Sequence, residues 1–221
     1  MKLSRLIDYL LGLPKTLLFN FKYFPIKIAC KLPVLLSKNV FLDITEGSIE
    51  LPDKITRGMI RIGFGTVGIF DRKRSRAIWR SAGKVIFKGT CHLGHGSKIS
   101  VGSNGVLEFG ENFSLTAESA IVCEENITFG DNCLVSWDCL FIDSDYHKLM
   151  TGGKRKNLNR PIHIGSHVWV CCRNTIMKGT EIPGGCVVAA GSLVSGKFTD
   201  EGCILGGNPC RVIGRNISWE G

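Results

Sequence analysis

The chain has 221 residues, 44% of them hydrophobic, and carries a formal net charge of +9 at neutral pH. This length fits one domain with at most a small appendage, and the apolar share allows a sizeable core. The 27 glycines favour many short strands joined by tight turns over long helices. The basic balance suits anionic partners. No helix-turn-helix, zinc-finger or RNA-recognition pattern is present, however, so we expect no nucleic-acid partner.

The cysteine pattern bears on the compartment. Ten cysteines are present without a C-x-x-C pair. Several of them, such as Cys133 and Cys186, stand where a small inward side chain is expected, and there a cysteine acts as a compact apolar residue. The first apolar run is interrupted by Arg5 and Asp8, which is unlike a secretory signal. We therefore expect a reduced, cytoplasmic protein.

Residues 1–45 form a distinct apolar and basic segment that three prolines interrupt. Helical spacing is followed by Leu6, Leu10, Leu13 and Leu17. No apolar run approaches the roughly eighteen residues that span a bilayer. Two interpretations stay open: the segment is a partly helical cap packed on the main domain, or residues 1–40 make a peripheral membrane contact through their lysines.

Large apolar residues then recur every six positions, from about residue 85 onward. The longest run consists of Ile164, Val170, Ile176, Ile182, Val188 and Val194. A period of six fits neither an α-helix nor a simple alternating strand, and it is the hexapeptide signature of a parallel β-helix. We therefore predict an all-β domain over residues 46–215, with stacked three-sided coils of about eighteen residues, and a tail at residues 216–221.

The six-residue rhythm stops after Asp143 and resumes near Val170. Between them, residues 148–160 read KLMTGGKRKNLNR and are rich in lysine and arginine. We predict that this segment leaves the β-helix as a protruding loop. Because a stacked prism has flat faces, a loop on a rigid scaffold is a common way to build a site. We expect the loop to wall a pocket beside His147.

Three stretches carry a family resemblance. They are DSDYH at 143–147, IGSHVWVCCRNTIMKGTEIPGGCVVAAGSLVSGK at 164–197 and GGNPCRVI at 206–213. In this order they resemble the hexapeptide-repeat acyltransferases, and among these the bacterial O-acetyltransferases of the maltose, galactoside and capsular-polysaccharide type. The resemblance covers roughly residues 85–215. It implies a left-handed β-helix, acetyl-CoA as acyl donor, a sugar or cell-surface polysaccharide precursor as acceptor, no metal, and a homotrimer with sites between neighbouring prisms.

Acyl transfer to a hydroxyl needs a base for the hydroxyl proton and donors for the developing oxyanion. Histidine suits the first role because its unperturbed pKa is about 6.5. The resemblance places the catalytic histidine at the start of the loop, which is His147 here. In an extended segment, Asp145 and Asp143 share a face with His147. Asp145 is our candidate for orienting the imidazole and Asp143 for a contact to substrate, and solvated turn aspartates are the alternative.

The resemblance also implies residues on the acceptor and donor sides. Trp169 follows the loop where the resembling enzymes line the acceptor pocket with a tryptophan, and an aromatic face suits sugar C–H groups. Its alternative role is packing at a corner of the prism. For acetyl-CoA, the resemblance implies backbone N–H groups of Cys172 and Ala190 near the acyl carbonyl or pantetheine arm. It also implies Lys197 and Arg211 near the phosphates, which cationic groups bind.

Three other interpretations stay open. A metalloenzyme would need three histidines to converge on zinc, drawn from His92, His95, His147, His163 and His167. A non-catalytic β-helix would serve as a scaffold at a membrane. An N-acetyltransferase of an amino sugar would use the same general base with an amine in place of the hydroxyl.

Overall fold

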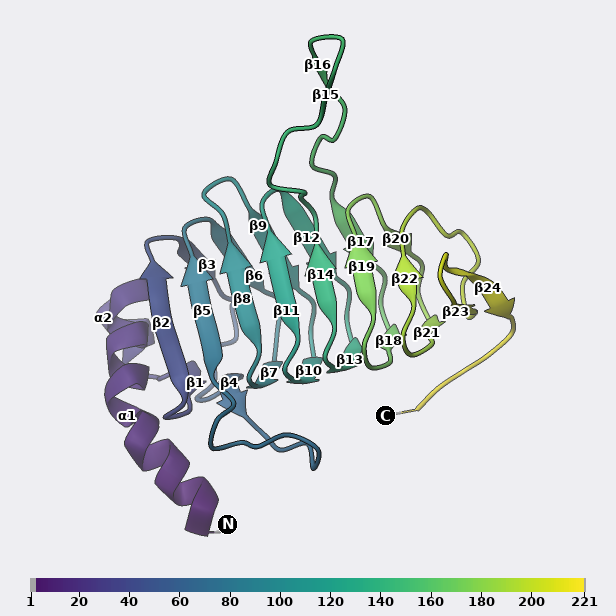
Figure 1. The fold of residues 1–221 in the computed structure, drawn as a ribbon. Coiled ribbons are helices and arrows are strands. Elements are labelled where there is room, and N and C mark those ends of the chain that lie inside the picture. The colour runs from purple at the N-terminus through teal and green to yellow at the C-terminus, as the bar shows by residue number, and fades with distance from the viewer. Residues whose placement is uncertain (1–2, 221) are drawn as a thin grey trace.

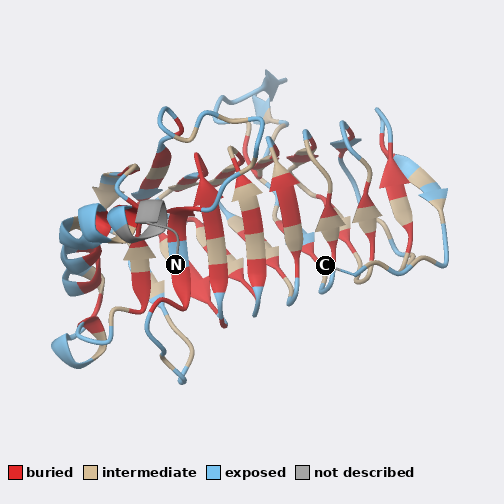
Figure 2. Ribbon diagram, turned by 90° about the horizontal axis from the view of Figure 1, so that it is seen from below, coloured by how far each residue is buried: buried red, intermediate tan, exposed pale blue. Residues whose placement is uncertain are grey.

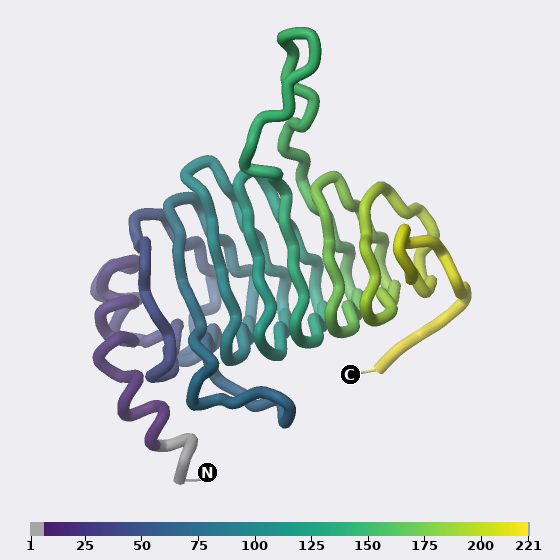
Figure 3. Tube along the Cα trace, in the orientation of Figure 1, coloured from purple at the N-terminus to yellow at the C-terminus, as the bar shows by residue number. Residues whose placement is uncertain are grey.

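The computed structural model describes residues 3–220, which wind into a three-sided prism of stacked coils with a helical cap at the N-terminal end (Figure 1). The cap consists of α1 (Leu3–Tyr23) and α2 (Ile26–Ala29). Neither described helix is long and apolar enough to cross a membrane. Figure 3 shows the path of the chain coil by coil, from the cap to the tail.

Each face of the prism is a sheet, and we call the three faces sheets A, B and C. Sheet A contains β1 (Val34–Leu36), β4 (Ile60–Phe64), β7 (Cys91–His95), β10 (Phe113–Ala117), β13 (Leu134–Trp137), β18 (Trp169–Val170), β21 (Val187–Val188), β23 (Ile204–Gly206) and β24 (Arg211–Gly214). Sheet B contains β2 (Val40–Thr45), β5 (Ala77–Ser81), β8 (Lys98–Val101), β11 (Ala120–Cys123), β14 (Leu140–Ile142), β19 (Thr175–Met177) and β22 (Leu193–Val194). Sheet C contains β3 (Ser48–Glu50), β6 (Lys84–Phe87), β9 (Val106–Phe109), β12 (Asn126–Phe129), β17 (Ile162–Ile164) and β20 (Glu181–Ile182). All neighbours within these sheets pair in parallel except β23 and β24.

The coils wind in a left-handed sense. In Figure 1 the strands of sheet B face the viewer and run upward, and the chain then crosses to the back of the prism. Successive coils advance from left to right. A chain that rises at the front and descends at the back while it advances to the right is a left-handed helix. The predicted left-handed parallel β-helix is confirmed.

Buried positions recur along the strands of successive coils (Figure 2). By strand register, apolar side chains at equivalent positions stack into columns inside the prism. One column of sheet B consists of Ile99, Ile121, Phe141, Ile176 and Val194. Each of these residues is at most 1% exposed. In sheet C the rings of Phe87, Phe109 and Phe129 stack with centroids 5.3 and 5.7 Å apart. Because each member is covered by those above and below, the core forms only when the coils stack.

The β-helix begins earlier in the chain than we placed it. Strands β1 and β2 lie within residues 1–45, yet they pair with β4 and β5 of the next coil. The helical cap therefore ends near residue 33. The first coils were hidden because they are longer than eighteen residues: Val34 and its partner Ile60 are 26 positions apart and Val40 and Ala77 are 37 apart, while Ile176 and Val194 are 18 apart.

Helix α1 closes the open edge of sheet A. Thr16 Oγ1 accepts a hydrogen bond from the Leu36 N–H (3.0 Å), and Asn20 Oδ1 accepts one from the Val34 N–H (3.2 Å). Asn20 Nδ2 also donates to the Val34 carbonyl (2.7 Å). Gly12 permits this approach, because a Cβ there would lie 2.1 Å from the Leu36 carbonyl oxygen. The polar groups of edge strand β1 are thus satisfied by a helix instead of a further strand.

A second connection, residues 65–76, leaves the prism between β4 and β5 and carries Arg72, Lys73, Arg74 and Arg76. We call it the basic loop. His95, which is 2% exposed, holds it in place: its Nε2 accepts a hydrogen bond from the Val67 N–H (3.1 Å) and its Nδ1 lies 3.0 Å from Ser75 Oγ. Ser75 in turn donates to Glu118. This arrangement requires a neutral imidazole with its proton on Nδ1.

Protonation of His95 at low pH should weaken its hydrogen bonds to the basic loop and so destabilise the folded protein. Burial lowers the pKa of His95, Glu118 acts in the opposite direction, and Arg72 lowers the pKa further. The unfolded chain therefore binds the proton first, so the free energy of unfolding should fall as the pH drops below about 6.5. The measurement is denaturant unfolding between pH 7.5 and 5.5. We expect His95→Gln to have a shallower pH dependence than the wild type, and the exposed His163→Gln to keep the wild-type slope. Equal slopes for all three proteins would contradict the assignment.

Candidate active site

The loop that contains His147 leaves the prism at the corner between sheets B and C. Strand β14 ends at Ile142 and β17 resumes at Ile162, and between them the chain forms an antiparallel hairpin of β15 (Met150–Thr151) and β16 (Lys154–Arg155). Figures 1 and 3 show this hairpin standing away from the coils. The predicted protruding loop is present. We call this corner of the prism the loop corner.

The two limbs of the loop are joined at its base by Asn157. Its Nδ2 donates to the His147 carbonyl (2.7 Å) and to Asp145 Oδ2 (2.9 Å), and its Oδ1 accepts from the Leu149 N–H (2.6 Å). Lys178, from the following coil, pairs with Asp145 and donates to the Leu158 carbonyl (3.2 Å). His147 therefore stands on a braced base although the loop itself projects into solvent.

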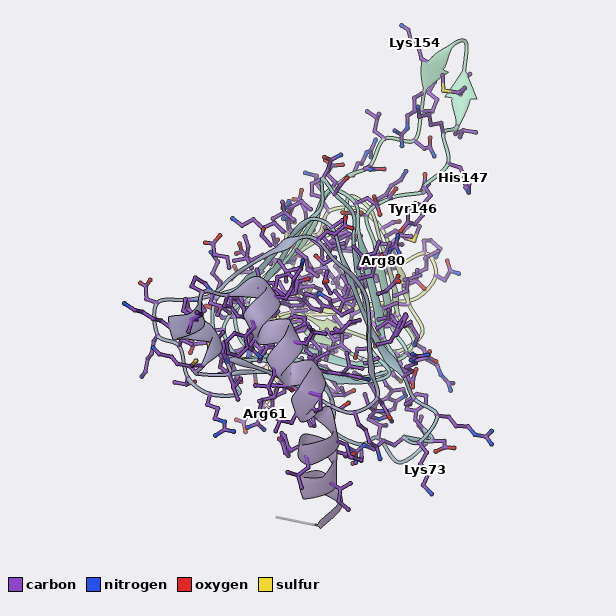
Figure 4. The ribbon with its side chains drawn as sticks, turned by 90° about the vertical axis from the view of Figure 1, so that its left-hand side faces the viewer. Arg61, Lys73, Arg80, Tyr146, His147 and Lys154 are labelled. Atoms are coloured by element: carbon purple, nitrogen blue, oxygen red, sulfur yellow. The ribbon has the colours of Figure 1, made fainter. Side chains whose placement is uncertain are left out.

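The His147 side chain is exposed at the point where the loop leaves the prism (Figure 4). Its backbone N–H donates to the Asp145 carbonyl at 2.6 Å. His147 does not line any of five surface cavities of 280–420 Å³ that residues 3–220 carry. The pocket expected beside His147 stays a prediction.

Asp145 braces the loop and does not contact the imidazole. Its carboxylate is bound by Lys178 and Asn157, and these hydrogen bonds, with that of Lys178 the larger, lower the pKa of Asp145 below its usual value. The expectation that Asp145 and His147 share a face holds only for an extended segment. The left-handed φ of 59° at Tyr146, between them, breaks that alternation.

Asp143 is an internal structural residue and not a surface contact for substrate. Its side chain is completely buried, and its two carboxylate oxygens accept hydrogen bonds from the N–H groups of Glu124 (2.8 Å), Glu125 (2.9 Å) and Asn126 (2.9 Å). A carboxylate that satisfies three consecutive backbone donors in the coil below ties the start of the loop to the prism. We therefore withdraw Asp143 as a candidate substrate contact.

Trp169 lies on sheet A, far from the loop corner of its own chain. Its Nε1 donates to Ser136 Oγ (3.2 Å), and its ring lies 6.0 Å from that of Trp219. Trp219 comes from the C-terminal tail and stacks on His167 at 4.3 Å. The sequence analysis did not single out Trp219, because no sequence signal indicates that the C-terminal tail folds back onto His167 and Trp169.

A cavity of 420 Å³ lies on sheet A beside this aromatic cluster. Its lining includes His167, Trp219, Asn112, Asn132 and Ser114. An aromatic ring with amide and hydroxyl groups around it is a combination that suits a sugar. Trp169 itself is not among the lining residues, so the structure gives it a packing role beside this cavity.

The candidate donor residues Cys172 and Ala190 lie at the corner between sheets A and B. The Gly191 N–H donates to the Cys172 carbonyl (3.1 Å), so the two corners stack directly on one another. Within residues 3–220 the backbone N–H groups of Cys172 and Ala190 have no hydrogen-bond acceptor. Stacked, unengaged N–H groups at a surface suit a thioester carbonyl or an amide chain. We call this corner the amide corner.

Arg211 extends the amide corner, and Lys197 does not. The turn before Arg211 stacks on this corner, since the Leu193 N–H donates to the Gly207 carbonyl (3.1 Å) and the Gly207 N–H to Ser192 Oγ (3.1 Å). Lys197 instead follows β22 toward the loop corner, where its Nζ lies 2.5 Å from Glu181 Oε1. The predicted phosphate contacts are thus divided between two corners.

The candidate residues therefore form two half-sites on different sides of one prism. His147 and Lys197 belong to the loop corner, and Cys172, Ala190 and Arg211 to the amide corner. The width of sheet B separates the corners, about 16 Å for five extended residues at roughly 3.3 Å each. Reacting atoms must approach to about 3–3.5 Å. Within one chain the two corners are therefore farther apart than reacting atoms can be.

The zinc alternative finds no support in the arrangement of the histidines. His163 lies beside Thr128 on sheet C (2.8 Å), His167 stacks on Trp219, and His95 holds the basic loop. Among residues 3–220 no group of three or more histidine, cysteine, aspartate or glutamate side chains is placed to hold a metal ion.

Comparison with known proteins gives several acetyltransferases among the relatives. No model of a known protein family matches the chain. The galactoside O-acetyltransferase of Escherichia coli strain K12 is 29% identical over 183 residues, which is 79% of this chain and 83% of that protein. The polysialic acid O-acetyltransferase of Escherichia coli O1:K1 is 32% identical over 134 residues, 60% of this chain and 41% of that protein. Two other relatives are matched over 46% and 54% of their length, so the chain spans about half the length of several relatives.

Among solved structures, the polysialic-acid-specific acetyltransferase NeuO superposes with a TM-score of 0.55 at 24% identity, over 84% of this chain and 74% of that one. At this identity the superposition supports the fold. In sequence and fold, the chain resembles the hexapeptide-repeat O-acetyltransferases.

The structural role of Asp143 predicts a stability effect. Asp143→Ala leaves three backbone donors without their acceptor, and hydrogen bonds to charged groups contribute about 1.5–3 kcal/mol each. We expect a loss of roughly 3 kcal/mol or more in the free energy of unfolding, measured by denaturant titration. The exposed Asp53→Ala should change it by less than about 0.5 kcal/mol. A variant at Asp143 with wild-type stability and a raised KM for acceptor would restore its role as a substrate contact.

Proposed function

We propose that this chain is an acetyl-CoA-dependent O-acetyltransferase that acts on a hydroxyl of a sugar or cell-surface polysaccharide precursor. The observation that carries the proposal is an exposed histidine on a braced loop, in a β-helix whose sequence is similar to two O-acetyltransferases. The unengaged N–H groups of the amide corner supply the second element that acyl transfer requires.

In the proposed reaction, the His147 imidazole takes the proton of the acceptor hydroxyl as the oxygen attacks the thioester carbonyl carbon. In this proposal the N–H groups of Cys172 and Ala190 donate to the carbonyl oxygen as it gains negative charge. The carbon–sulfur bond then breaks, and the imidazolium returns its proton to the departing thiolate. Each step is a direct transfer, so the chain forms no covalent intermediate.

The donor would lie along the amide corner, parallel to the prism axis. Cys172, Ala190 and the turn before Arg211 stack there in successive coils. A long, narrow molecule with an acyl group at one end and phosphates at the other fits such a row, with Arg211 as the cation for the phosphates. Lys197 would contact the phosphates from the loop corner.

We also propose that the enzyme is a homotrimer. The separation of the two half-sites supports this, because a neighbouring prism would bring its loop corner to the amide corner of the first. Cyclic assembly repeats that heterologous contact three times and closes. Each site would then contain His147 of one subunit and the amide corner of the next, with Trp169 on an adjoining face. We place the enzyme in the cytoplasm, with residues 1–40 in contact with a membrane.

The test is transfer of radiolabel from acetyl-labelled acetyl-CoA into a panel of sugars and envelope glycans. General-base catalysis contributes about 10²–10⁴-fold, so His147→Ala should lower kcat by that factor. Binding of CoA, measured by calorimetry, should be unchanged, because the donor lies along the amide corner. His163→Ala, an exposed histidine on sheet C, should retain full activity. Near-wild-type turnover by His147→Ala would remove it from the mechanism, and the absence of both transfer and CoA binding in the wild type would overturn the proposed function.

A further inference from the structure

Helix α1 presents a large apolar face to the outside of the molecule. In Figure 1 it lies across the N-terminal end of the prism, and Figure 2 shows much of its length as exposed. The exposed apolar side chains of this face are Ile7, Leu10, Leu11, Leu13, Leu17, Leu18 and Phe21, from 39% to 66% exposed. They recur at helical spacing on one side of α1, and Ile26 of α2 is also exposed, at 72%. We call this set the outer face of α1.

The inward side of α1 mixes polar with aromatic residues. It carries Asp8, Thr16 and Asn20, each at most 5% exposed, beside Phe19, which is 1% exposed and packs on Trp79. Thr16 and Asn20 are used to satisfy edge strand β1, and Asp8 pairs with Arg72 of the basic loop. A surface helix normally turns its leucines inward. Seven large apolar side chains on the solvent side therefore indicate a surface that another body covers.

The charge around the outer face is positive. Between Asp8 and Asp43 the sequence contains no aspartate or glutamate. The cations of that stretch are Lys15, Lys22, Lys27, Lys31 and Lys38. Lys22, Lys27 and Lys31 are exposed, and within residues 3–220 none of the three forms an ion pair. The basic loop adds Lys73, which projects beside α1 in Figure 4.

This charge distribution decides between the candidate partners. A second copy of the chain, docked end to end through the same face, would bring two rims of lysines together and repel. An anionic lipid surface offers hydrocarbon for the leucines and negative charge for the lysines at once. Such a combination of apolar face and basic flank is typical of helices that lie in a membrane interface.

We propose that the outer face of α1 docks the protein on an anionic lipid bilayer, with Lys22, Lys27 and Lys31 at the headgroups. The prism axis then stands away from the membrane. Four strand spacings of about 4.8 Å separate β2 from β14, so the loop corner lies roughly 20 Å beyond the first coil. An acceptor attached to a lipid in the same bilayer would present its sugars at that height. The docking itself does not rest on the proposed acetyl transfer.

The experiment is cosedimentation of the purified full chain with vesicles of phosphatidylcholine, with and without phosphatidylglycerol. We expect wild-type protein to sediment with the anionic vesicles and to be partly released by salt. In Leu11→Asp/Leu18→Asp two outward leucines, 57% and 66% exposed, are replaced. This change should lower the partition coefficient by roughly 100-fold. Leu11→Ser/Leu18→Ser should lower it as well, which separates lost apolar contact from added negative charge.

The matched control is Ile213→Asp/Leu158→Asp, which adds the same charge at residues 63% and 58% exposed, away from α1. It should sediment like the wild type. All variants are first checked for wild-type size by gel filtration. Wild-type protein that stays in the supernatant with anionic vesicles would overturn the proposal, as would undiminished binding of the α1 variants. A wild-type assembly that the α1 variants disperse, without any vesicle binding, would overturn it in favour of a second copy as the partner.

Discussion

Parallel pairing of each strand with the equivalent strand one coil away is the constraint on which the rest of the structure depends. It requires that residues at equivalent positions point the same way in every coil. Large apolar side chains therefore form continuous columns, such as the one from Ile99 to Val194. The same pairing makes the three faces flat, so the projecting chemical groups lie at the corners, at the ends and on the two insertions, which are the loop with His147 and the basic loop. The candidate site residues accordingly lie at the loop corner and at the amide corner.

This constraint explains why the two half-sites lie apart. A corner repeats from coil to coil, so unengaged N–H groups at Cys172 and Ala190 stack into a row suited to an extended donor. The loop with His147 can only leave at a corner, and it does so at the other end of sheet B. Asn157 and Lys178 keep the base of the loop fixed, which a catalytic histidine on a projecting segment needs. A shared site between copies is the simplest way to join the halves.

The two ends of the β-helix must also be covered, because each presents an unpaired strand edge. At the C-terminal end β24 turns back antiparallel on β23. At the N-terminal end α1 uses Thr16 and Asn20 for the same purpose. The inner side of α1 carries these polar residues together with the buried Phe19, and the leucines of α1 are left on the outside. The cap and the proposed membrane surface are thus two sides of one helix.

Sequence reasoning found the parts of the structure that are local or periodic. The hexads from Ile164 to Val194 predicted inward residues because spacing and burial follow directly from the coil. The first coils escaped because their connections are longer, as the 26 positions between Val34 and Ile60 and the 37 between Val40 and Ala77 show. Asp143 was misassigned because its partners lie 17–19 positions away in the coil below. The Lys178 contact to Asp145 spans 33 positions and the fold-back of Trp219 onto His167 spans 52, and neither has a local signal.

The most direct test of the shared site is a subunit-mixing experiment. His147→Ala carries an intact amide corner, and Arg211→Glu carries an intact loop corner. Each variant alone should be nearly inactive. When the two are dissociated, mixed in equal amounts and reassembled, about a quarter of the sites in a randomly mixed trimer would combine both intact halves. Recovery of about a quarter of wild-type transfer is the result that the account predicts. Activity that stays at the level of the separate variants, in trimers shown by native mass spectrometry to be mixed, would mean that each chain builds its site alone.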